Sequence, residues 1–154
     1  MRRNFINFIL IVFFTFVTNC GYTPLLNSDK INFNIVDLNF EGDRKINNYI
    51  ENSLRNQTST KNEVKKFNLN ITSTYKKTIT NKDESGDPKN YNLQIKTNVV
   101  VTSSDGQKSN NNFEKNISLS AQDKKIDERE LEKKYIKDLS ELIGKDIIFF
   151  LINQ

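Results

Sequence analysis

The sequence predicts an α+β fold: a four-stranded, mainly antiparallel sheet with two helices packed on one face, in the order β-α-β-β-β-α. Two observations predict this class. Apolar and polar residues alternate in four segments, which is typical of strands with one buried and one wet face. Two other segments repeat apolar residues at helical spacing, and each has a polar opposite side. Such helices need a sheet to cover their apolar sides.

The first strand and first helix are expected between residues 31 and 54. Apolar residues alternate with asparagine from Ile31, and the alternation shifts by one position at Ile35 and Val36, which predicts a β-bulge there. Asp43 is a suitable N-cap, and apolar residues follow it at helical spacing up to Leu54.

Three further strands are expected over residues 67–79, 91–101 and 113–121, forming an antiparallel meander. Their apolar residues occupy odd positions, while Asn, Thr, Gln and Lys fill most even ones. Asp105-Gly106 is typical of a tight hairpin, whereas the loop over residues 81–90 is expected to be longer and charged. With both helices on the odd-numbered face, the even-numbered face remains open and polar.

The last helix is expected to start at Asp127 as N-cap. Glu130 would complete a capping box, and Ile126 with Leu131 would form a hydrophobic staple. The tail over residues 147–152 is apolar nearly all round. It is either the deepest part of the core or a partner-binding end, and the core is the favoured interpretation.

Residues 1–19 have the layout of a secretory signal peptide, with two arginines before an apolar run over residues 5–17. The run is shorter than the roughly 20 residues of a membrane span, which makes a permanent span the weaker alternative. Cys20 follows directly and resembles the acylated cysteine of the bacterial lipobox, although Asn19 departs from the usual Gly, Ala or Ser. A chance thiol is the alternative. Two or three acyl chains on Cys20 would anchor the chain through a polar tether over residues 20–30.

The composition excludes several function classes. Without residues 1–19 the chain keeps 21 of its 23 basic residues and all 19 acidic ones, so the net charge falls from +4 to +2. This removes most support for nucleic-acid binding. The chain has no histidine and no second cysteine, which excludes histidine-based triads and thiolate or imidazole metal sites. We therefore expect no enzyme, no catalytic residue, no metal site and no cofactor.

The start of the mature chain, Cys20-Gly21-Tyr22-Thr23-Pro24-Leu25, together with the element order, resembles the LptE family of lipopolysaccharide-assembly lipoproteins. The likeness extends over the α+β domain of residues 31–154. It implies an outer-membrane lipoprotein, facing the periplasm, that sits as a plug inside the LptD β-barrel. There it would assist barrel assembly and deliver lipopolysaccharide to the outer leaflet.

The resemblance also implies contact with lipopolysaccharide through basic residues. Lys76 and Lys96, which point away from the core in the predicted strands, are the candidates for this contact. An auxiliary lipoprotein subunit of an envelope lipid-transport ABC system is the alternative function. Co-purification of either a large barrel or an inner-membrane permease distinguishes the two.

Overall fold

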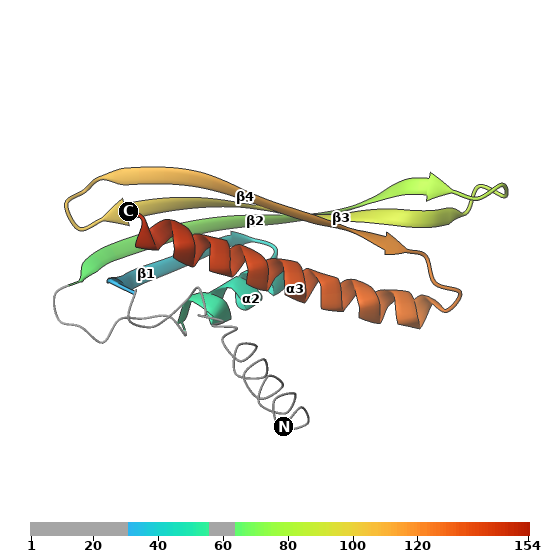
Figure 1. Ribbon diagram of the computed structural model, residues 1–154, viewed down its shortest axis with the longest axis horizontal. Coiled ribbons are helices and arrows are strands. Elements are labelled where there is room, and N and C mark those ends of the chain that lie inside the picture. The colour runs from blue at the N-terminus through green and yellow to red at the C-terminus, as the bar shows by residue number, and fades with distance from the viewer. Residues whose placement is uncertain (1–30, 56–63) are drawn as a thin grey trace, which may run out of the picture.

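The computed structural model describes residues 31–55 and 64–154. Its elements are β1 (Phe33–Gly42), α2 (Arg44–Arg55), β2 (Lys65–Lys82), β3 (Pro88–Ser103), β4 (Lys108–Ser120) and α3 (Lys125–Ile152). Both helices lie on the same side of the sheet (Figure 1). The predicted α+β class and element order are confirmed. The expected signal peptide and tether, with Cys20, lie outside the described residues.

The four strands form one sheet in the order β1-β2-β3-β4. β1 and β2 are parallel, because α2 carries the chain back to the end of the sheet where β1 began. β2, β3 and β4 are antiparallel neighbours, as the meander predicts. The register between β1 and β2 shifts between Ile35 and Asp37, which confirms the predicted β-bulge.

The two hairpins of the meander share the same short turn. Each turn contains a glycine with a left-handed backbone conformation, Gly86 at φ +89° and Gly106 at φ +84°. In the first, the amide of Gly86 donates to the carbonyl of Asp83 over 3.1 Å. The loop predicted over residues 81–90 spans only residues 83–87, because the polar residues on both sides continue the strands. It is charged as predicted, with Asp83, Glu84 and Asp87.

A tight turn joins β1 to α2. The carboxylate of Asp43 accepts the amides of Lys45 (2.9 Å) and Ile46 (3.2 Å), which confirms Asp43 as N-cap. The Asp43 amide donates to the carbonyl of Ser73 on β2 over 3.0 Å. Gly42 has φ +90°, and a Cβ there would lie only 2.0 Å from that same carbonyl oxygen. The turn therefore requires glycine for both its φ and its close approach to β2.

The core lies between the helices and the odd-numbered side chains of β2, β3 and β4, as predicted. Its largest fully buried members are Phe33, Ile46, Ile50, Leu54, Leu69, Ile71, Leu93, Ile95, Leu119, Ile143, Ile147 and Ile148. Two of these residues, Leu93 and Leu119, form a separate, smaller cluster with Tyr91, which packs against the first half of α3. β1 and α2 do not extend over this end of the sheet (Figure 1).

Helix α3 begins at Lys125, two residues before the expected cap, and its N-cap residue makes no side-chain hydrogen bond. The predicted capping box of Asp127 with Glu130 is therefore wrong. The staple of Ile126 with Leu131 is wrong too, since Ile126 is 65% exposed. Asp127 lies inside the first turn, where its charge interacts favourably with the helix dipole.

The apolar end of α3 belongs to the core. Ile147, Ile148 and Leu151 are buried, which confirms the favoured interpretation of the tail. Phe150 packs edge-on against Phe113 of β4, with ring centroids 6.0 Å apart. Phe149 is the exception and stays 61% exposed.

Gly144 lies where α3 packs tightly against α2. A Cβ at this position would lie 2.6 Å from the Cβ of Ser53 on α2. The Ser53 hydroxyl donates to the Tyr49 carbonyl of its own helix, so this small side chain is held in place. Glycine costs about 1 kcal/mol relative to alanine within a helix, and the close contact with α2 offsets that cost here.

Candidate functional site

The face of the sheet opposite the helices is the candidate site, and we call it the open face. Each of β2, β3 and β4 contributes its even-numbered side chains, and β1 contributes odd-numbered ones after its bulge. Its central members are Asp37, Asn39 and Glu41; Asn68, Asn70, Thr72, Thr74 and Lys76; Asn92, Gln94, Lys96, Asn98 and Val100; and Asn110, Asn112, Glu114, Asn116 and Ser118. No helix within the described ranges covers it (Figure 1).

Side-chain amides on the open face bind one another across strands. Asn98 donates to the side-chain oxygens of Asn110 (2.7 Å) and Asn112 (2.8 Å). At the other side of the sheet, Asn39 donates to the side chain of Asn70 over 3.2 Å. Each amide has two donors and one acceptor oxygen, so hydrogen-bonding capacity remains after these bonds are made. The open face thus presents partly oriented donors and acceptors to a partner.

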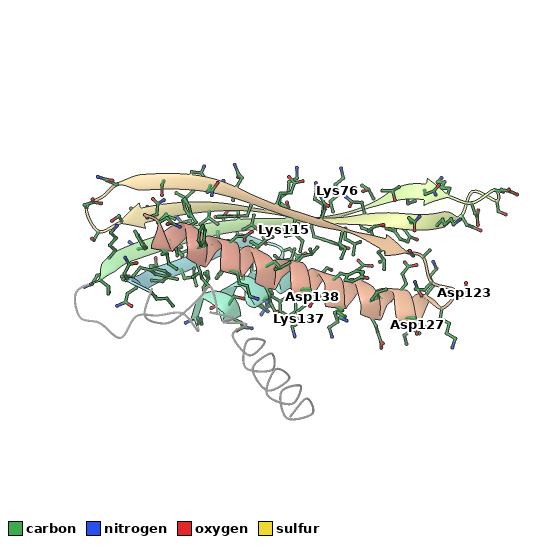
Figure 2. All side chains as sticks on the ribbon, viewed as in Figure 1. Lys76, Lys115, Asp123, Asp127, Lys137 and Asp138 are labelled. Atoms are coloured by element: carbon green, nitrogen blue, oxygen red, sulfur yellow. The ribbon has the colours of Figure 1, made fainter. Side chains whose placement is uncertain are left out.

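Lys76 and Lys96 both lie on the open face, as the strand alternation predicts, and Figure 2 shows Lys76 on the side away from the helices. Lys96 is paired with Thr74 across β2 and β3, which makes the two lysines diagonal neighbours roughly 7 Å apart. Lys96 also forms an exposed ion pair with Glu114 at 3.3 Å. Lys76 takes part in no ion pair with the described residues. That these lysines bind a ligand stays a prediction.

A charged cluster on the opposite, helix-covered face was missed by sequence reasoning. Lys77 Nζ lies 3.0 Å from Glu128 and 2.8 Å from Glu132, both on α3. The Tyr75 hydroxyl donates to Glu132 over 2.6 Å, and Lys77 lies 4.1 Å from the ring centre of Tyr91. The odd position of Lys77 in β2 was the signal that could have placed it toward the helices.

Contacts within the cluster shift the pKa values of its members, so that the two glutamates and Lys77 stay charged and Tyr75 stays protonated. Burial alone would raise the pKa of Glu128 and Glu132, but their hydrogen bonds and attraction to Lys77 outweigh it and lower both pKa values. Burial would likewise lower the pKa of Lys77, and the two carboxylates raise it instead. Burial and the bond to Glu132 both raise the pKa of Tyr75. The cluster therefore ties β2 to α3 at neutral pH.

Among the described residues, the open face carries hydrogen-bonding side chains, and the helix-covered face contains the ion pairs of Lys77. Residues 31–55 and 64–154 contain no group of three or more His, Cys, Asp or Glu side chains placed to hold a metal ion. Within these same ranges no helix combines the length and apolar character needed to cross a membrane.

No protein-family model matches the sequence, and a search of curated proteins finds no relative. Solved structures do share the fold. Rare lipoprotein B from Shewanella oneidensis matches with a TM-score of 0.55 at 15% identity, covering 78% of this chain and 98% of that one. An uncharacterized lipoprotein B from Nitrosomonas europaea matches with a TM-score of 0.56 at 12% identity, covering 82% and 88% of the two chains.

A minor lipoprotein from Acinetobacter baumannii matches similarly, with a TM-score of 0.51 at 15% identity, and covers 81% of this chain and 93% of that one. At these identities the likeness concerns the fold. Most of each solved domain has a counterpart here, so this fold is already found in bacterial lipoproteins.

Proposed function

We propose that the chain is a non-enzymatic outer-membrane lipoprotein that plugs an LptD-like β-barrel, assists its assembly and helps deliver lipopolysaccharide to the outer leaflet. The open face carries this proposal. It is broad and mostly uncharged, and the charged residues among its central members, Asp37, Glu41, Lys76, Lys96 and Glu114, sum to a net charge of only −1, which suits the hydrated lumen of a wide barrel. A surface rich in partly oriented amides forms many hydrogen bonds without burying unpaired charge.

The membrane anchor in this proposal is Cys20, which follows a signal-like segment and precedes the tether over residues 20–30. Acylation there would hold the domain beside the membrane that contains the barrel. We expect mass spectrometry of the mature N-terminus to find a diacylglyceryl-modified Cys20, and a Cys20→Ser chain to leave the membrane fraction. An intact leader on the purified protein would contradict the anchor.

Lys76 and Lys96 are the residues that we propose for contact with the phosphate groups of lipopolysaccharide. They neighbour each other at the centre of the open face, and phosphate oxygens accept strong hydrogen bonds from lysine. The pair sits among neutral amides and hydroxyls, so a phosphate bound there would meet a single acid, Glu114, nearby.

Substitution of Thr72 by tryptophan tests the role of the open face. Thr72 is exposed near the centre of β2, and a bulky ring there would block contact with a barrel wall while leaving the core unchanged. In cells depleted of the wild-type protein, we expect Thr72→Trp to lower co-purified barrel and surface lipopolysaccharide at least tenfold. Asp138→Trp, on the exposed side of α3 shown in Figure 2, is the matched control and should restore both.

Co-purification with the wild-type protein also distinguishes the barrel plug from the alternative, a transport subunit. If the barrel co-purifies, replacing Lys76 and Lys96 together by alanine should reduce the lipopolysaccharide that co-purifies with the complex. The amount of co-purified barrel should not change. Capture of an inner-membrane permease in place of a barrel would favour a subunit of a lipid-transport ABC system. Normal barrel assembly in depleted cells would refute the proposal.

A further inference from the structure

The outer edge of β4 differs from the outer edge of β1. β1 is interrupted by its bulge, and the Asp37 side chain accepts the backbone amide of Leu38. A bulge of this kind discourages further strand pairing. β4 runs for 13 residues with no bulge in its pairing to β3 and no proline. It therefore presents a long, regular edge.

The hairpin geometry shows which backbone groups point out of this edge. At one end of the β3–β4 ladder the amide of Ser103 donates to the carbonyl of Gln107, and at the other end the amide of Ala121 donates to that of Lys89. The register is continuous between these ends, so odd-numbered residues of β4 bond to β3. The amides and carbonyls of its even-numbered residues point outward.

Two side chains confirm this assignment. The outward amide of Asn112 donates to the side chain of Asn111 over 2.9 Å, and the outward carbonyl of Ser120 accepts from Gln122 over 3.0 Å. Between them, the amides and carbonyls of Glu114, Asn116 and Ser118 have no partner among the described residues. No strand of residues 31–55 or 64–154 other than β3 pairs with β4, so as far as these residues go the middle of the edge can pair with another strand.

Helix α3 adds apolar surface beside this edge. Asp146 binds Lys115 of β4 at 2.7 Å, and Figure 2 shows Lys115 between the sheet and α3. Leu142 and Phe149 lie four residues before and three after Asp146, which places them on the same side of the helix. They are 46% and 61% exposed. A strand added to β4 would cover them.

We propose that this edge pairs with the β4 edge of a second copy of the chain, forming a twofold-symmetric dimer with one continuous eight-stranded sheet. The strands would run antiparallel with Lys115 on the twofold axis. Asn112, its amide exchanging the Asn111 side chain for the second copy, would then bond with Ser118 of the second copy, and Glu114 with Asn116. This inference concerns the isolated protein and does not depend on the proposed barrel partner.

The composition of the edge favours a second copy as the occupant. In this register Phe113 faces Ile117 of the second copy, and Leu142 of one α3 lies toward Phe149 of the other. The two copies of Lys115 come together, but each is already neutralised by its own Asp146. A register with Glu114 on the axis would instead oppose two carboxylates, which is unfavourable.

The helices also fit this arrangement. α3 packs over both β3 and β4, and an axis midway between these strands would lie about half a strand spacing inside the edge. With neighbouring strands about 4.8 Å apart, the two α3 axes would be separated by about 10 Å. Packed helices have this separation, so Leu142 and Phe149 could fill the space between them.

Paired cysteines test both the dimer and its register. We expect the full chain with Asn112→Cys and Ser118→Cys together, purified in mild detergent, to form a disulfide-linked dimer in more than half of the molecules. Each single substitution is a control, because neither position meets itself across the axis. The two cysteines of one strand lie about 20 Å apart and cannot bond to each other.

Asn116→Pro provides an independent measurement. Proline removes an outward amide and leaves the bonds to β3 intact, so the mass in detergent should fall from two chains to one with an unchanged circular dichroism spectrum. Asn116→Ala keeps the amide and should stay dimeric. A wild-type monomer, a dimer that survives Asn116→Pro, or cross-linking of the double-cysteine chain to a different protein would overturn the proposal.

Discussion

Replacing Gly42 by alanine is expected to destabilise the domain by about 3 kcal/mol or more. The residue has φ +90°, a conformation that costs a residue with a side chain roughly 1–2 kcal/mol. The added Cβ would also overlap the Ser73 carbonyl oxygen and push apart the bond that it accepts from the Asp43 amide, a loss of about 1 kcal/mol. Urea unfolding followed by circular dichroism measures the change.

The hairpin glycines supply the comparison. Gly86 and Gly106 have similar φ values, +89° and +84°, but apart from the adjacent residues no atom of the described chain would lie within 4 Å of a Cβ at either position. Their replacement by alanine should cost only the conformational part, roughly 1–2 kcal/mol. An equal loss in all three variants would show that the contact between Gly42 and Ser73 contributes nothing.

Replacing Lys77 by methionine is expected to destabilise the domain by about 2–3 kcal/mol at pH 7. The change leaves Glu128 buried without its main cationic partner and Glu132 with only the Tyr75 hydroxyl. Loss of one member of a buried pair costs about 3–5 kcal/mol, and the 25% exposure of Lys77 reduces that figure. Denaturant unfolding at pH 7 checks the value.

The pH dependence of the same variant identifies the cause. The pKa values of Glu128 and Glu132 are lowered in the folded protein, so their contribution is complete above the unfolded pKa of about 4.3 and is lost as pH falls through the folded values. In Lys77→Met the difference from wild type should therefore shrink below about pH 4, where both carboxyls become neutral. A difference independent of pH would mean that lost packing, and not charge, is responsible.

Lys76→Met is the matched control for this measurement. The residue is adjacent in sequence, lies on the open face and has no ion pair with the described part of the chain. Its substitution should change the free energy of unfolding by less than about 0.5 kcal/mol. Comparing Lys76→Met with Lys77→Met therefore compares the stability contributions of adjacent lysines on opposite faces of β2.

The sheet could be predicted from sequence because strand alternation assigns every residue to one of two faces. This placed the bulge at Ile35, the open face and the outward positions of Lys76 and Lys96 correctly. The cap of α2 was equally local, since the Asp43 carboxylate accepts the amides two and three residues ahead.

Features that depend on tertiary contacts could not be predicted from strand alternation or from local capping patterns. The start of α3 satisfied the local pattern of a capping box at Asp127, yet the helix begins earlier and turns Glu128 toward Lys77 on another element. The partners of Lys77 are separated from it by about fifty residues of sequence. The free edge of β4 likewise follows from strand order, which alternation alone does not give.

The division of the apolar side chains into two clusters has a consequence for cooperativity. The end of the sheet around Tyr91, Leu93 and Leu119 is covered by the first half of α3, while the remainder is covered by both helices. Opening that end exposes a small share of the apolar surface and leaves the larger cluster intact. Amide protons there can therefore exchange with solvent through partial unfolding, at a lower free energy than those beneath α2.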